Sequence, residues 1–189
     1  MTRAAGSPYT PNERRILAFS GIAHLSVHFF EQMFPTAAVA IALDAGLPVE
    51  KVLAWSFLGY LLFGVGALPA GLLTDRWQAR RMLQVCLIGT GAAAILVAAS
   101  PAGSGVMLSL GLLGLFSSIY HPAGMSLIAS GVRERGRALG LNGIFGNVGI
   151  AGAPVAAAVT IGVLGWRGTY ALYGMALLLA GVASLAAAM

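Results

Sequence analysis

The sequence predicts an all-α membrane protein with six membrane-spanning helices, and two observations carry this prediction. The first is composition: of 189 residues, 58% are hydrophobic and only 9% are charged, with a mean hydropathy of +0.86. Because a soluble domain carries about 25% charged residues, this composition excludes a typical soluble enzyme, disordered chain or nucleic-acid-binding domain. The second is that apolar runs of about 20 residues, the length that crosses a bilayer, recur along the chain.

These apolar runs occupy nearly the whole chain after a polar first segment. We expect residues 1–15 to form a cytoplasmic segment and residues 16–189 to form one transmembrane bundle. The expected spans cover residues 16–43, 52–74, 82–100, 106–130, 138–164 and 169–189. The first run is too long for the core of a signal peptide and contains ionisable residues, so we interpret it as a retained helix.

The basic residues indicate the orientation of the chain. Nine of the eleven lie before the first span or in the breaks between spans two and three and between spans four and five. These three segments would share one side of the membrane, and the positive-inside rule makes that side cytoplasmic. With six spans both termini then face the cytoplasm, in what we expect to be a bacterial inner membrane. The net charge of +5 is interpreted as anchoring to the lipid bilayer, with no nucleic-acid partner.

Ionisable side chains inside the expected spans are the candidate functional residues. His24, His28 and Glu31 lie within a stripe of roughly 60° on one helix face, and His121 lies in the fourth span beside Tyr120. Because a charge at the bilayer centre costs roughly 2.5–3.5 kcal/mol, such residues are functional candidates. We expect them to carry protons or to contact a solute. The alternative is that the histidines only form hydrogen bonds that fix helix contacts.

A transition-metal site is a second interpretation of the same region. His121 and Met125 lie one helical turn apart, and imidazole and thioether groups are both ligands for soft or borderline metals such as copper. Met125 is also an ordinary packing residue in many apolar helices. No other cofactor is implied by the sequence.

Two further segments have a recognisable pattern. The break between spans two and three combines a carboxylate at a helix end with guanidinium groups, which predicts either a gating contact or a solvated loop. Its residues are Gly71, Asp75, Arg76, Arg80 and Arg81. In the fifth span a glycine recurs at every third position from Gly140 through Gly149 to Gly152, and Pro154 follows. We expect close helix packing and a kink, a hinge in the bundle.

These two segments resemble signatures of the major facilitator superfamily. The residues from Gly71 to Arg81 are similar to its cytoplasmic loop between helices two and three, with the motif glycine missing and one residue added before the basic pair. The run from Gly140 to Pro154 resembles its antiporter signature, with alanine in place of several glycines. Ser20, His24 and Glu31, followed by Tyr120-His121-Pro122, are similar to the fosmidomycin-resistance-type branch.

The resemblance implies a secondary active transporter for a small solute, coupled to protons as an antiporter and without enzymatic activity. It covers only the first six of the twelve helices of the family, so the chain is either a piece of a longer transporter or a stand-alone half-transporter, and we expect the second. The expected partner is a second six-helix half, formed by another copy of the chain in a homodimer. The alternatives are a copper-type metal transporter and a structural partner half that does not itself transport. Motifs of membrane proteases and of zinc peptidases are absent.

Overall fold

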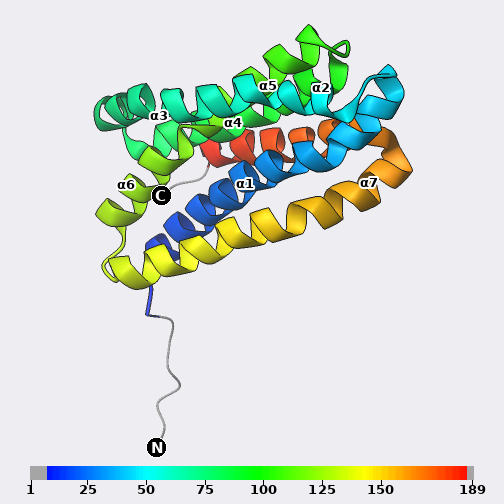
Figure 1. Cartoon of the computed structure of the whole chain (residues 1–189). Helices are drawn as coiled ribbons and strands as arrows, with labels where there is room; N and C mark the ends of the chain where they lie inside the picture. Colours follow the sequence, from blue (N-terminus) through cyan, green and yellow to red (C-terminus); the bar gives the residue numbers. More distant parts are fainter. Residues whose placement is uncertain (1–7, 187–189) are drawn as a thin grey trace, which may run out of the picture.

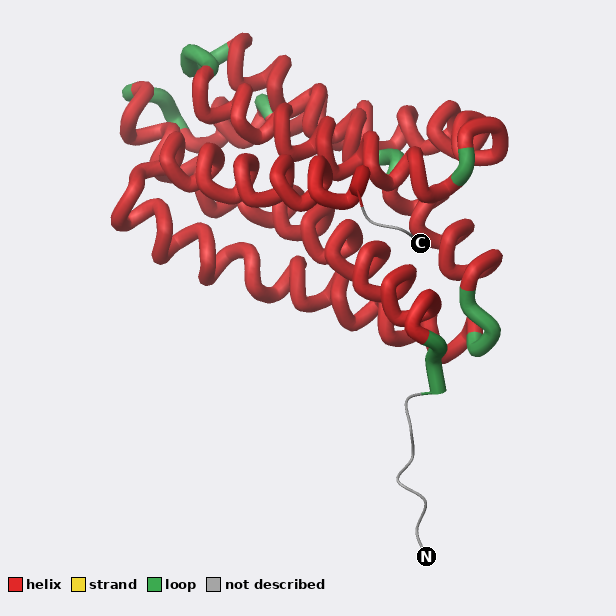
Figure 2. The backbone as a smooth tube through the Cα atoms, turned by 180° about the vertical axis from the view of Figure 1, so that it is seen from behind, coloured by secondary structure: helices red, strands yellow, loops and turns green. Residues whose placement is uncertain are grey.

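The structure is a computed structural model that describes residues 8–186. All regular elements in this range are helices joined by short loops, which confirms the all-α prediction (Figure 2). The helices are α1 (Pro11–Ala45), α2 (Val49–Ala54), α3 (Ser56–Trp77), α4 (Ala79–Ala99), α5 (Ser104–Ser117), α6 (Tyr120–Gly131) and α7 (Arg135–Ala186).

Helix α1 has clear sequence signals at both ends. Thr10 and Glu13 form a capping box in which the Thr10 N–H donates to Glu13 Oε2 at 2.7 Å and the Glu13 N–H donates to Thr10 Oγ1 at 3.2 Å. Pro11 occupies the first turn, where its missing N–H costs nothing. The helix ends at Gly46, whose φ of 64° is the left-handed conformation that glycine favours. These signals define a 35-residue helix that includes the expected first span.

The six expected spans do not appear as six separate helices. The span expected at 52–74 falls on α2 and α3, which meet at Trp55, and the one expected at 106–130 falls on α5 and α6. The second interruption has a physical cause, because Pro122 has no N–H to donate to the Ser118 carbonyl four residues earlier. The last two expected spans are joined in the 52-residue helix α7.

Helix α7 turns back on itself at Gly165. This residue has φ 67° and ψ 171°, a conformation outside the helical region that glycine adopts readily. Figure 1 shows the chain reversing direction there, so α7 has a first arm (residues 135–164) and a second arm (residues 166–186). The turn is fastened to its neighbours: Trp166 Nε1 donates to Asp44 Oδ2 at 3.2 Å, and Arg167 Nη1 donates to the carbonyl oxygen of Ser100 at 2.6 Å.

Four segments of the described chain are long and apolar enough to cross a membrane. They are Val49–Trp77, Ala79–Ala99, Ser104–Gly131 and Arg135–Ala186. Helix α1 is not among them, so the first of the six expected spans is not identified by length and apolarity alone. It is long enough, but His24, His28, Glu31 and Gln32 lie in its middle and lower its hydropathy. The same polar residues that are candidates for function therefore make α1 less apolar than the other helices.

The two arms of α7 pack closely against two different helices of the bundle. The first arm lies along α1 and the second along α4, while α5 packs against α3 and α4 (Figure 1). A Cβ added at Gly149 would overlap the carbonyl oxygen of Leu25 on α1. One added at Gly174 would lie 2.9 Å from the carbonyl oxygen of Gly91 on α4. Residues without a side chain therefore let the backbones of these helix pairs approach closely.

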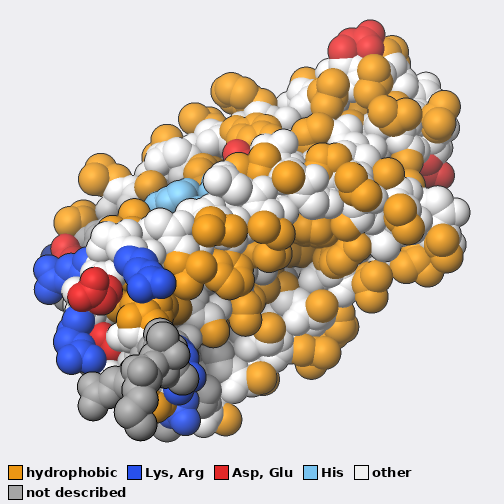
Figure 3. Space-filling view, turned by 90° about the horizontal axis from the view of Figure 1, so that it is seen from below, with side chains coloured by type: hydrophobic (Ala, Val, Ile, Leu, Met, Phe, Trp, Pro, Cys, Tyr) orange, Lys and Arg blue, Asp and Glu red, His pale blue; other side chains and the backbone are white. Residues whose placement is uncertain are grey.

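Much of the outer surface is apolar. Leu43, Leu68 and Val163 are 81%, 76% and 80% exposed, and hydrophobic side chains are spread over the face seen in Figure 3. On that face Lys and Arg side chains gather at the end of the molecule where α1 begins. An outward apolar surface with charge gathered at one end is typical of a protein surrounded by lipid.

Candidate functional site

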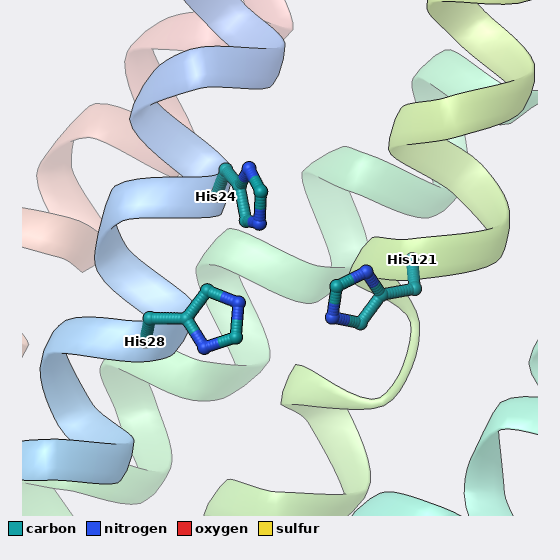
Figure 4. A group of neighbouring side chains, drawn as sticks. All are labelled: His24, His28 and His121. Atoms are coloured by element: carbon teal, nitrogen blue, oxygen red, sulfur yellow. The ribbon is translucent and has the colours of Figure 1, made fainter. Parts of the chain in front are cut away.

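Three histidines from two helices converge in the structure. His24 and His28 project from α1, and His121 projects toward them from the first turn of α6 (Figure 4). The ring centres are separated by 4.9 Å for His24 and His28, 5.7 Å for His24 and His121, and 5.6 Å for His28 and His121. One nitrogen from each ring can be chosen such that all three lie within 4.8 Å of one another. The structure thus brings the residues expected in spans one and four into one cluster.

The ring of His24 is held from several sides. Its Nδ1 donates a hydrogen bond to the backbone carbonyl oxygen of Asn142 on α7, at 2.8 Å. The ring stacks on Tyr120 with a centroid separation of 4.6 Å and an interplanar angle of 19°. A Cβ added at Gly146 would lie 2.6 Å from His24 Nε2, so the ring occupies the space left by a glycine of α7. His24 is therefore fixed by three elements, α1, α6 and α7.

His28 and Glu31 form a pair on α1. His28 Nδ1 lies 2.8 Å from Glu31 Oε2, and the two side chains are 17% and 27% exposed. The pair is an ion pair when the imidazole is protonated and a neutral–charged hydrogen bond when it is not. Glu31 also lines a largely apolar pocket between α1, α3 and α5, together with Phe34, Tyr60 and other side chains. A carboxylate thus lies at the junction of the histidine cluster and an aromatic-lined pocket.

Asn142 belongs to the site although sequence reasoning did not select it. Its Nδ2 donates to the hydroxyl of Tyr120 at 2.7 Å, its backbone carbonyl accepts from His24, and it is 2% exposed. A buried amide in an otherwise apolar and glycine-rich run was the signal available in the sequence. Its role follows only from the structure, because residues 24 and 142 are far apart in the chain.

The expected gating residues lie at the end of α3 and the start of α4. Gly71 and Asp75 are on the last turns of α3, with Asp75 exposed and without a salt bridge to any residue from 8 to 186. Asp75 and Arg80 both line a pocket between the ends of several helices. Arg80 Nη2 also donates to the carbonyl oxygen of Ser184 at 3.4 Å, which connects α4 to the second arm of α7. Arg76 and Arg81 are exposed.

Gln78 occupies the turn between α3 and α4 in an unusual conformation. Its φ of 76° and ψ of 134° make it the one non-glycine residue from 8 to 186 with positive φ. The loop signature that this segment resembles has a glycine that this sequence lacks. The backbone at Gln78 adopts a conformation that suits glycine, so the turn is made there at a cost in strain.

The remaining expected residues are more dispersed. Gly149 lies against the backbone of Leu25, whereas a Cβ added at Gly140 would meet no atom within 4 Å. Pro154 is inside the first arm of α7. Met125 is on α6, one turn after His121, and is 43% exposed.

A polar contact outside the histidine cluster joins the start of α1 to the loop before α7. Glu13 Oε1 accepts from the backbone N–H of Arg133 at 2.9 Å, while Oε2 accepts from the backbone N–H of Thr10. These two backbone donors lower the pKa of the Glu13 carboxyl from 4.5 to about 2. The sequence places Glu13 in the expected cytoplasmic segment and Arg133 in a basic break between spans, and it does not indicate that the two residues meet.

Two comparisons with known proteins bear on these observations. A model of the Major Facilitator Superfamily matches residues 21–189. The puromycin resistance protein pur8 of Streptomyces alboniger is 32% identical over 117 residues. The aligned segment covers 60% of this chain and 23% of that protein, so the chain matches about a quarter of the length of this curated relative.

Proposed function

Because the chain belongs to the major facilitator superfamily, we propose that it is one half of a secondary active transporter for a small solute in a bacterial inner membrane. The family consists of transporters and not of enzymes, and the chain is an integral membrane protein. Within the family, the residues Ser20, His24, Glu31 and Tyr120-His121-Pro122 support the fosmidomycin-resistance-type branch.

The proposed membrane topology uses six crossings. Helix α1, the pair α2 and α3, helix α4, the pair α5 and α6, and the two arms of α7 each cross the bilayer. The turn at Gly165, which lets α7 return across the membrane, supports this division. The gathering of Lys and Arg at one end of the molecule supports placing that end, with both termini, in the cytoplasm (Figure 3).

The observation that carries the proposed function is the polar cluster on α1 and α6 within an apolar bundle. His24, His28, Glu31 and His121 lie on helices where ionisable groups are expensive, and Glu31 borders an aromatic-lined pocket. The His28–Glu31 pair is a hydrogen-bonded imidazole and carboxylate, and Glu31 lies on the wall of the pocket. We therefore assign proton coupling to this pair and solute contact to the pocket and to Tyr120 and His121.

The pairing of this chain with a second six-helix half is suggested by the architecture of the family. Its transporters contain two six-helix halves that are parallel repeats, with the solute bound between them. Two copies of this chain inserted in the same orientation could pair about a two-fold axis and build such a cavity. In that arrangement α1 and α6 would face the partner. A structural half without its own transport activity is the alternative, distinguished by activity that requires a different polypeptide.

The test uses inside-out membrane vesicles and puromycin as the first solute, since the relative is named for resistance to it. Solute-dependent proton movement is followed with a pH-sensitive dye. The Glu31→Gln variant should insert normally and lose the signal, whereas Glu50→Gln should keep it, because Glu50 is an exposed carboxylate on α2. Equal signals from the wild type and Glu31→Gln would remove Glu31 from the coupling mechanism.

Homodimer formation is tested separately by native mass spectrometry of the protein released from detergent and by cross-linking in membranes. Two copies per particle are expected. A strictly monomeric species that retains transport activity would refute the half-transporter proposal without affecting the assignment of Glu31.

A further inference from the structure

The three imidazole rings are spaced as they would be around a single metal ion. In tetrahedral zinc sites the metal lies about 2.0–2.1 Å from each imidazole nitrogen, which puts the ring centres about 5 Å apart. The observed separations of 4.9, 5.6 and 5.7 Å are close to this value. Figure 4 shows a nitrogen of each ring turned toward the space between them.

Hydrogen bonding prepares two of the rings as ligands. The Asn142 carbonyl can only accept, so His24 Nδ1 carries the hydrogen and Nε2 has the free lone pair. The Glu31 carboxylate has the same effect on His28, whose Nδ1 donates to it at 2.8 Å. Metal-binding histidines typically donate their second ring nitrogen to a carbonyl or a carboxylate in this way, which fixes the tautomer and the ring orientation.

The third ring is the one that can adjust. The chosen ligand nitrogens lie within 4.8 Å of one another, and a tetrahedral ion would draw them to about 3.3 Å. His121 has no hydrogen bond to any residue from 8 to 186, unlike the other two histidines, so its side chain can rotate toward them. Histidine atoms are also visible on the molecular surface in Figure 3, and all three side chains are only partly buried, so the cluster is not sealed inside the bundle.

We propose that His24, His28 and His121 bind one divalent transition-metal ion of the zinc class through nitrogen, with Glu31 as a positioning residue behind His28. Three nitrogen ligands favour Zn²⁺, Co²⁺, Ni²⁺ or Cu²⁺ over Mg²⁺ and Ca²⁺, which prefer oxygen. The fourth coordination position is left to water or an incoming group, as in zinc sites that exchange ligands. This differs from the His121 and Met125 pair suggested by the sequence, because the site is built from nitrogen without a thioether.

The experiment measures binding in the purified protein and does not depend on transport. The chain contains three histidines, all of them in the cluster, so an affinity tag without histidine leaves no competing imidazole. Zn²⁺ binding is measured by isothermal titration calorimetry, and Co²⁺ is used as a spectroscopic probe of tetrahedral nitrogen coordination. One ion per chain is expected, with competition between the two metals.

Variants distinguish the ligands from their surroundings. His121→Gln should weaken binding by at least 100-fold, and Glu31→Gln by about 10-fold, the usual effect of changing a group behind a ligand. Gly146→Ala should also weaken it, since the new methyl group would displace the His24 ring. Met125→Leu and Cys86→Ser are matched controls that alter the nearby thioether and the buried thiol and should bind as the wild type does.

Several outcomes would overturn the proposal. These are unchanged affinity in His121→Gln, loss of binding in Met125→Leu, or a Co²⁺ spectrum of octahedral type. Protection of the wild-type histidines by Zn²⁺ against carbethoxylation provides a readout that needs no variant to fold, and lack of protection would also refute the site. Intact metal binding without any solute-dependent proton signal would count against the proposed function alone.

Discussion

Replacing Gly149 by alanine tests the close approach of α1 and the first arm of α7. The added Cβ would overlap the carbonyl oxygen of Leu25 and lie 3.1 Å from its carbonyl carbon. Both obstacles are backbone atoms, which cannot rotate away as a flexible side chain would. Overpacking costs about 1–3 kcal/mol, and the upper part of that range applies here. Alanine recovers about 1 kcal/mol of helix propensity, so we expect a net loss of about 2 kcal/mol.

The matched control is Gly152→Ala, three residues further along the same arm. A Cβ there would meet no atom within 4 Å, so the substitution should be neutral or stabilising by up to about 1 kcal/mol. Thermal unfolding of both variants in the same detergent gives the comparison. At about 2–4 °C per kcal/mol for a chain of this size, Gly149→Ala should lower the Tm by about 4–8 °C. A Gly149→Ala variant as stable as Gly152→Ala would refute the packing described for this helix pair.

Two further predictions concern stability at other positions. Gln78→Gly should raise stability by about 1 kcal/mol because it relieves the positive φ, whereas Ala79→Gly, at a helical position beside it, should lower stability by about the same amount. The pKa of Glu13 is lowered to about 2, so its contribution is complete above pH 4.5 and is lost as the pH falls toward 2. The Tm difference between the wild type and Glu13→Gln should therefore shrink across that window, and a constant difference would contradict the contact with Arg133.

Most of the helical architecture is predictable from hydrophobicity, but the helix boundaries are not. An apolar run identifies a segment that prefers lipid, but it does not show where the helix is interrupted. The interruption before Pro122 follows from one missing N–H, and the reversal at Gly165 from one φ angle. Neither changes the composition of the surrounding run. The first span shows the opposite effect, since its polar stripe lowers its hydropathy without shortening the helix.

The candidate site is predictable only in part, because some of its contacts are local in the chain and others are not. The shared face of His24, His28 and Glu31 follows from helical periodicity, a local property of the chain. The approach of His121 to that face depends on how α6 packs against α1, and the contribution of Asn142 depends on α7. Contacts of this kind join residues about a hundred positions apart, and one sequence does not specify them.

The hydrogen bond between His24 and Asn142 links ligand binding at the histidine cluster to the spacing of α1 and α7. The same imidazole lies in the histidine cluster and in the gap that Gly146 leaves between α1 and the first arm of α7. A ligand that binds best when this ring is in place therefore stabilises the close approach of the two helices. By reciprocity, any movement that separates the helices lowers the affinity for the ligand by the same factor. The ligand affinity of the site therefore reports how closely α1 and the first arm of α7 approach each other.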